Sequence, residues 1–140
     1  MTSIRPSRLL KLALLADATV SATIATLHLS LAGPLTEWLI LTKPLLIETG
    51  VFLVGFVALL LVIARRASVW AWLVRTIVLG NVGWALGCVA LLALGAVTPS
   101  PLGLAFLAAH GVGVLGFALL EWIGLRASTP VNPSPPLGAY

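Results

Sequence analysis

The sequence predicts an all-α membrane protein, a transmembrane four-helix bundle whose helices run up and down in turn. Of its 140 residues, 60% are hydrophobic and 9% are charged, whereas about a quarter of the residues in a soluble domain are charged. Such a chain could not cover a water-facing surface. It also contains four apolar stretches, each long enough to cross a bilayer. We therefore expect one integral membrane domain over about residues 1–126, with the lipid bilayer as its surroundings.

Proline, glycine and arginine mark the span boundaries. Gly33-Pro34 ends the first stretch, Pro44 suits the first turn of the second, and Arg65 and Arg66 end it. The third stretch exceeds the roughly 20 residues that a bilayer requires, so we expect it to tilt or to begin within the interface. The expected spans are about residues 9–31, 44–64, 69–97 and 102–125.

Basic residues predict the orientation. Seven fall on one side of the predicted membrane: Arg5, Arg8, Lys11, Arg65, Arg66, Arg75 and Arg126. Only Lys43 falls on the other side, so both termini are expected in the cytoplasm. Because these residues adjoin span ends and form no basic patch interleaved with aromatic residues, nucleic acid is not an expected partner. The proline-rich segment 127–140 is expected to be a disordered cytoplasmic tail.

Two further features are the loop between the first two spans and a pair of glycines within the third span. Residues 34–43, between the first two spans, mix apolar and polar residues. They are expected to lie flat in the interface, or alternatively to cover the outer mouth of the bundle. Gly83 and Gly87 in the third span have the spacing at which helices approach closely. We interpret them as a packing face, within the bundle or against another protomer.

Ionisable residues recur at matched spacing within the spans. Asp17 and His28 are eleven residues apart in the first span, and His110 and Glu121 are eleven apart in the fourth. Eleven residues make about three helical turns, so each acid shares a helical stripe with its histidine. Ionisable groups at membrane depth are costly and by default suggest function.

Depth divides the polar residues into two tiers. At about 1.5 Å per residue, an outer tier lies roughly 5–12 Å below the outer end of the spans and an inner tier roughly 21–28 Å below it. The outer tier comprises His28, Glu48 and His110, and the inner tier comprises Asp17, Asn81 and Glu121.

The outer tier permits two kinds of cofactor site. Two facing imidazoles, His28 and His110, can ligate the iron of haem b. The same histidines with Glu48 can instead hold a divalent metal. No motif fixes either geometry, and the competing interpretation is that His28 only hydrogen-bonds a carbonyl or water near the interface.

The inner tier permits proton chemistry. Two carboxylates in a low-dielectric site cannot both ionise cheaply, which is typical of proton relays. The competing interpretations are that Asp17 pairs with Asn81 and holds helices together, and that Glu121 reaches water beside Arg126. Trp84, three residues from Asn81, either lines a cavity for a flat hydrophobic ligand or packs with its N–H bonded to Asn81.

Four short runs resemble a known group of proteins. They begin at Leu14 (LLADA), Gly80 (GNVGWA), Thr98 (TP, followed by Leu102-Gly103) and Glu121 (EWIGLR). Together they resemble small uncharacterised bacterial four-span integral membrane proteins in the DoxX-like neighbourhood. The resemblance implies a four-helix bundle in the bacterial inner membrane with no established activity. It favours Asp17, Asn81 and Trp84 as the shared site, departs at Glu121, where the group has glutamine, and does not feature the histidines.

The leading functional hypothesis is a small non-enzymatic membrane protein. The sequence contains no phosphate loop, activated serine or cysteine pair. We expect it to bind a hydrophobic or lipid-like ligand around Asp17, Asn81 and Trp84. The other expectation is that it serves as an accessory subunit of a larger membrane complex. A homo-oligomer is a third form of assembly that the sequence allows. One alternative is a proton-coupled small carrier that uses Asp17 and Glu121. The other is a b-type haem redox protein with His28 and His110 as axial ligands.

Overall fold

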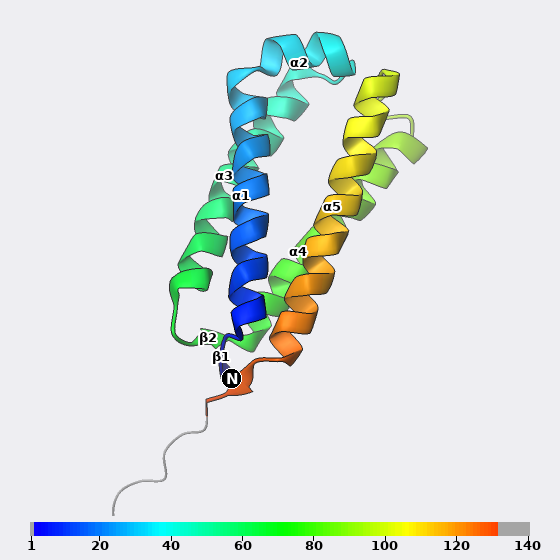
Figure 1. The fold of residues 1–140 in the computed structure, drawn as a ribbon. Coiled ribbons are helices and arrows are strands. Elements are labelled where there is room, and N and C mark those ends of the chain that lie inside the picture. Colours follow the sequence, from blue (N-terminus) through cyan, green and yellow to red (C-terminus); the bar gives the residue numbers. More distant parts are fainter. Residues whose placement is uncertain (1, 132–140) are drawn as a thin grey trace, which may run out of the picture.

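The computed structural model describes residues 2–131 and places four long helices side by side (Figure 1). They are α1 (Arg8–Ser30), α3 (Lys43–Arg65), α4 (Ala71–Ala93) and α5 (Pro101–Arg126), while the short α2 (Ala32–Leu39) crosses one end of the bundle. Each long helix is long and apolar enough to cross a membrane. The predicted all-α fold with four spans is therefore confirmed.

Local chemistry sets the helix ends. Ser7 precedes α1 and its hydroxyl accepts a hydrogen bond from the backbone N–H of Leu10 at 3.1 Å, which is the role of an N-cap. The third span is shorter than the predicted 69–97. Residues 69–70 form a strand instead, and Gly95, with φ of +65°, follows the last turn of α4 in the left-handed conformation that ends helices.

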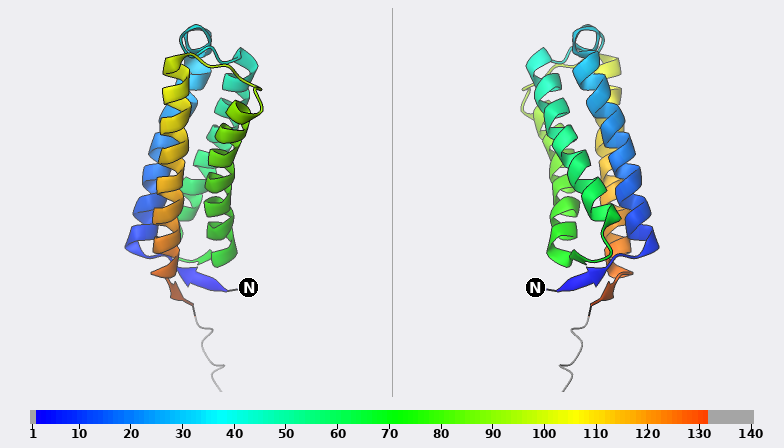
Figure 2. Two further views of the ribbon diagram at one scale, coloured as in Figure 1. Left: turned by 90° about the vertical axis from the view of Figure 1, so that its right-hand side faces the viewer. Right: turned by 90° about the vertical axis from the view of Figure 1, so that its left-hand side faces the viewer.

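A small three-stranded sheet, which the sequence did not predict, closes the end at which residues 2 and 131 lie (Figure 2). The central strand β1 (Ser3–Arg5) pairs antiparallel with β2 (Val69–Trp70) and with β3 (Thr129–Pro130). Residues 127–131 of the predicted disordered tail are thus ordered, and residues 132–140 lie outside the described part of the chain. We call this end the basic end, because Arg5 lies in its sheet and Arg126 ends α5 there.

The helices do not pack evenly. Helix α1 packs against α3 and α5, and α5 packs against α4, but the backbones of α3 and α4 stay apart, and these two helices meet only through side chains. The larger buried cluster lies toward the basic end and includes Leu10, Leu14, Leu60, Val74 and Ile77. The smaller cluster lies toward the other end, the α2 end: Leu39, Leu41, Leu46 and Leu107. The bundle is therefore well filled toward the basic end and less filled toward the α2 end.

Helix α2 occupies much of the segment that was expected either to lie flat or to cover the bundle. It packs against α3 and α5 and buries Leu39. Ser100, just before α5, holds its end: its backbone N–H donates to the Leu39 carbonyl at 3.0 Å, and its hydroxyl donates to the Trp38 carbonyl at 2.7 Å. Helix α2 therefore covers part of the end of the bundle, as in the second expectation, and because it crosses the long helices it also lies flat, as in the first (Figure 1).

Candidate functional site

Asp17, Asn81 and Glu121 meet in the interior of the bundle. They come from α1, α4 and α5, so three separate helices position them. The side-chain amide of Asn81 donates one hydrogen bond to Asp17 Oδ2 at 2.9 Å and another to Glu121 Oε2 at 3.2 Å. The hydroxyl of Ser21, one turn along α1, donates to Asp17 Oδ1 at 2.9 Å. These contacts assemble the predicted inner tier as one hydrogen-bonded group, which we call the acid cluster.

The acid cluster is withdrawn from solvent. Asp17 and Glu121 are both 0% exposed and Asn81 is 3% exposed. The interpretation that Glu121 reaches water beside Arg126 is wrong, because Glu121 is fully buried. Arg126 lies over the ring of Trp122, 5.7 Å from its centroid. Glu121 Oε1 is buried with no hydrogen-bond partner among the described residues. A buried polar atom without a partner is costly.

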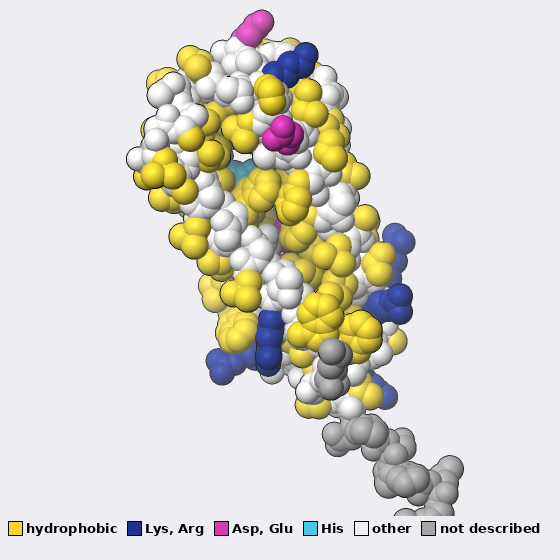
Figure 3. Space-filling view, turned by 180° about the vertical axis from the view of Figure 1, so that it is seen from behind, with side chains coloured by type: hydrophobic (Ala, Val, Ile, Leu, Met, Phe, Trp, Pro, Cys, Tyr) yellow, Lys and Arg dark blue, Asp and Glu magenta, His cyan; other side chains and the backbone are white. Residues whose placement is uncertain are grey.

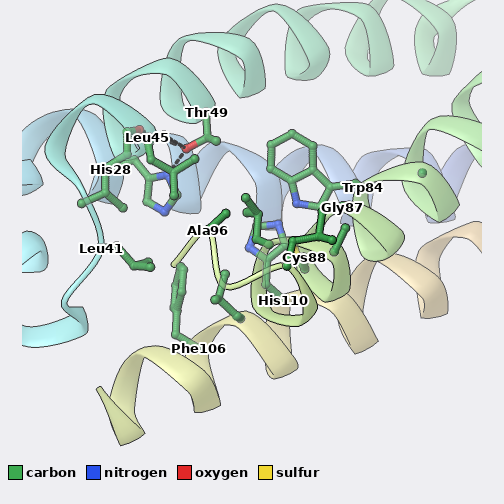
Figure 4. A pocket seen from close by; sticks show the side chains of 16 residues that line it. His28, Leu41, Leu45, Thr49, Trp84, Gly87, Cys88, Ala96, Phe106 and His110 are labelled. Carbon is green, nitrogen blue, oxygen red and sulfur yellow. Dashed lines mark hydrogen bonds between the residues drawn. The ribbon is translucent and has the colours of Figure 1, made fainter. Parts of the chain in front are cut away.

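A cavity of about 540 Å³ lies between the helices toward the α2 end (Figure 4). From behind, where α3 and α4 form the visible face, the surface is hollowed and a histidine is visible inside (Figure 3). Lining side chains come from α1, α3, α4 and α5 and include His28, Leu46, Thr49, Trp84, Cys88, Phe106, Leu107 and His110. We call this space the α3–α4 cavity.

Both predicted histidines line the α3–α4 cavity. His28 is 5% exposed, and its Nδ1 lies 3.0 Å from the hydroxyl oxygen of Thr49 on α3. Its Nε2 is buried without a hydrogen-bond partner in residues 2–131. Phe106 connects the two imidazoles, since its ring centroid lies 5.8 Å from that of His28 and 6.0 Å from that of His110. The two histidines therefore share one site. The spacing of residues along the sequence did not indicate that Thr49 and Phe106 belong to it.

Trp84 belongs to this cavity and not to the acid cluster. Its ring stacks on Phe52 of α3 at 5.4 Å and on His110 at 5.8 Å. The Trp84 N–H could be accepted only by the side-chain carbonyl oxygen of Asn81, and the side-chain hydrogen bonds of Asn81 among the described residues go to the two acids instead. Of the two interpretations for Trp84, the cavity-lining one agrees with the structure.

The predicted metal trio does not form. Glu48 is an exposed residue of α3, and residues 2–131 contain no group of three His, Cys, Asp or Glu side chains that could hold a metal ion. Because successive helical residues turn by about 100°, Glu48 and its neighbour Thr49 face different directions. The outer tier therefore separates into two cavity histidines and one surface carboxylate.

A smaller cavity of about 200 Å³ borders both sites. Asp17, Ser21, Phe106 and His110 all line it. His110 thus borders both cavities, and Asp17 joins the smaller one to the acid cluster. Ser21 was missed as a site residue, although its position one turn after Asp17 was a usable signal.

Two glycines of α4, Gly83 and Gly87, line the α3–α4 cavity instead of forming a tight packing face. A Cβ atom placed on Gly83 or on Gly87 would meet nothing within 4 Å. Both residues border the cavity. The interpretation of Gly83 and Gly87 as a helix-packing face within the bundle is therefore wrong. Because they have no side chains, they leave room for the cavity.

Comparison of the chain with protein-family models, with curated proteins and with solved structures returned no match. The resemblance to small bacterial four-span proteins therefore stays an expectation, and only the site itself indicates a function.

Proposed function

We propose that this protein binds an apolar small molecule from the bilayer in the α3–α4 cavity. The cavity itself carries the proposal: about 540 Å³ of space is lined mainly by leucine, glycine, alanine and aromatic residues. Ligand sites typically enclose roughly 300–1,000 Å³ and combine an apolar lining with a few polar groups. His28, His110 and Trp84 are the polar groups available here.

The lipid phase is the natural source of such a ligand. The cavity opens on the α3–α4 face (Figure 3). Apolar side chains of both helices are exposed, such as Val51 of α3 at 59% and Leu86 of α4 at 64%, as suits contact with lipid tails. The ligand would enter sideways between α3 and α4. With the basic end in the cytoplasm, the cavity lies in the outer half of the membrane, which we propose to be a bacterial inner membrane.

Filling the cavity tests this proposal. Gly87→Leu places a side chain at a cavity-lining position, where an added Cβ atom meets nothing within 4 Å. Gly80→Leu, on the same helix and also with open space around its Cβ, changes a residue that does not line the cavity. The probe is 4-hexylanisole, an apolar ring compound, and the measurement is native mass spectrometry of the protein in lipid nanodiscs. We expect the wild type and Gly80→Leu to bind the probe and Gly87→Leu to lose at least tenfold in affinity. Equal binding by all three would refute the cavity as the site.

The same preparation tests the companion possibilities. A co-purifying polypeptide or a second copy of the chain would support an accessory or oligomeric role. A reducible Soret absorption band that is lost in His110→Ala would instead favour haem bound between His28 and His110.

A proton-coupled carrier is the second candidate, and the acid cluster favours it. Two fully buried acids share one amide donor. Asp17 and His110 line the same smaller cavity, and His110 also lines the ligand site. This function predicts that Glu121→Gln abolishes pH-dependent uptake of the ligand into vesicles. Uptake by Glu121→Gln with the wild-type pH dependence would argue against coupling through this residue.

A further inference from the structure

We propose that the ligand of the α3–α4 cavity carries a hydroxyl group, as a membrane-soluble alcohol or phenol does, and that this group donates a hydrogen bond to Nε2 of His28. The inference depends on the proposed function, because it names the class of molecule that the same cavity takes.

The hydrogen-bond partners of Thr49 assign the two ring nitrogens of His28. A threonine hydroxyl has one hydrogen to donate and lone pairs with which to accept. The hydroxyl of Thr49 lies 2.7 Å from the Leu45 carbonyl oxygen on the preceding turn, which takes that hydrogen. Toward Nδ1 of His28, at 3.0 Å, the hydroxyl oxygen must then accept. Nδ1 therefore carries the ring hydrogen, and Nε2 is a bare acceptor.

This acceptor lacks a donor. Nε2 is buried and has no hydrogen-bond partner among residues 2–131, and the side chain is 5% exposed. In the close view the ring lies with one nitrogen toward Thr49 and the other toward the interior of the cavity (Figure 4). A buried acceptor that lacks a donor costs free energy, and a ligand hydroxyl would remove that cost.

The neighbours of His28 narrow the chemistry of the donor. Leu41, Leu46, Phe106 and Leu107 line the same cavity. A single water would be poorly held there, since a buried water needs two to four polar partners. A cationic donor would be buried among these apolar side chains, which is costly. A neutral hydroxyl on an apolar body satisfies Nε2 and matches the rest of the wall.

Nitrogen NMR tests the assignment directly. The chain has only two histidines, so protein labelled with ¹⁵N-histidine in nanodiscs shows four ring nitrogens, and the His110→Gln variant identifies those of His28. We expect Nδ1 to be protonated and Nε2 to be unprotonated. On addition of 4-hexylphenol, the Nε2 resonance should move toward the position of a hydrogen-bonded nitrogen. A protonated Nε2 in the free protein would overturn the proposal.

A matched pair of probes tests the preference for a donor. The methyl ether 4-hexylanisole keeps the ring and the oxygen of 4-hexylphenol but lacks its O–H. We expect the wild type to prefer the phenol by about five- to tenfold, the usual range for one hydrogen bond. The ether lacks the polar O–H, so partitioning into the bilayer alone would favour the ether. Partitioning therefore cannot account for a preference for the phenol.

Variants at Thr49 connect the preference to the tautomer. Thr49→Ser keeps the hydroxyl that accepts from Nδ1 and should keep the preference. Thr49→Val removes it, which should produce a mixture of tautomers and reduce the preference toward unity.

The two proposals fail in different ways. Equal affinity of wild-type protein for both probes would overturn the hydroxyl assignment and leave the cavity as a ligand site. Binding of neither probe would overturn both proposals.

Discussion

Asn81 donates both hydrogens of its side-chain amide inside the spanning part of the bundle, one to Asp17 and one to Glu121. Among the described residues, Asn81 is the side chain whose single nitrogen donates to residues on two other helices. Because the two acids lie on α1 and α5 and Asn81 lies on α4, this single amide links three helices. Such a contact stabilises the bundle and also positions the acids for any proton chemistry.

Replacing Asn81 by leucine should therefore destabilise the bundle. Asn81→Leu leaves Asp17 Oδ2 and Glu121 Oε2 without their amide donor in a buried site. We expect a loss of about 1–3 kcal/mol in the free energy of unfolding, measured by denaturant titration in detergent. Thr19→Val is the control, since Thr19 is exposed and bonds only to its own helix. An unfolding free energy equal to that of wild type would show that the amide does not hold the helices together.

Glu121 should tolerate a neutral replacement. The groups that bond to the acids are an amide and a hydroxyl, which carry no charge, so an ionised Glu121 would be buried beside Asp17 without a counter-charge. Glu121→Gln keeps a carbonyl oxygen for Asn81 and removes that charge. We expect unchanged or higher stability, by up to about 1 kcal/mol. A loss above 2 kcal/mol, larger than the typical cost of one lost hydrogen bond, would mean that the carboxylate itself is required.

Helices α1 and α5 approach each other closely at the basic end. A Cβ atom on Gly124 of α5 would lie 2.7 Å from both the backbone nitrogen and Cα of Leu10 in α1. The hydroxyl of Ser7 donates to the Gly124 carbonyl at 2.7 Å, and the hydroxyl of Ser128 donates to the same oxygen at 2.8 Å. Ser128 also accepts from the backbone N–H of Ser7. A glycine and two serines thus join the start of one helix to the end of the other.

Two glycines of α5 should respond to alanine in opposite directions. Gly124→Ala forces the backbones of α1 and α5 apart and should cost about 1–3 kcal/mol. Gly116→Ala adds a methyl group where nothing lies within 4 Å, so it should gain up to about 1 kcal/mol from helix propensity. Thermal unfolding in detergent measures both. If the two variants changed stability alike, the close approach at Gly124 would not be supported.

The whole molecule is filled at one end and hollow at the other. Toward the basic end, a large apolar cluster, a small sheet and the Ser7–Gly124–Ser128 contacts join all four long helices. Toward the α2 end, a smaller cluster under α2 holds the helices, and α3 and α4 leave a cavity between them. The molecule therefore has a well-packed base at the basic end and a hollow α2 end.

The orientation of the bundle is open to a direct test. The chain has one cysteine, Cys88, so a Cys88→Ser background accepts single reporters at exposed sites. Glu37 lies on α2, and Ser68 lies between α3 and α4 at the basic end. With the basic end in the cytoplasm, Glu37→Cys should react with a membrane-impermeant maleimide in intact cells, and Ser68→Cys should react only after lysis. The reverse pattern would invert the proposed orientation.

The sequence alone determined the four spans, because apolar length and the scarcity of charge are properties of composition that hold whatever the helices contact. It also separated Asp17, Asn81 and Glu121 from the outer residues, because depth follows from the rise per residue along a helix. Only the tertiary structure decided the rest. Helix rotation and pairing decide which helices touch and where a cavity remains between α3 and α4. They also decide that Glu121 is buried and that Glu48 is exposed. In a nearly uniform apolar sequence, few residues report the rotation of a helix, and contacts such as Thr49 with His28 arise only when two helices meet.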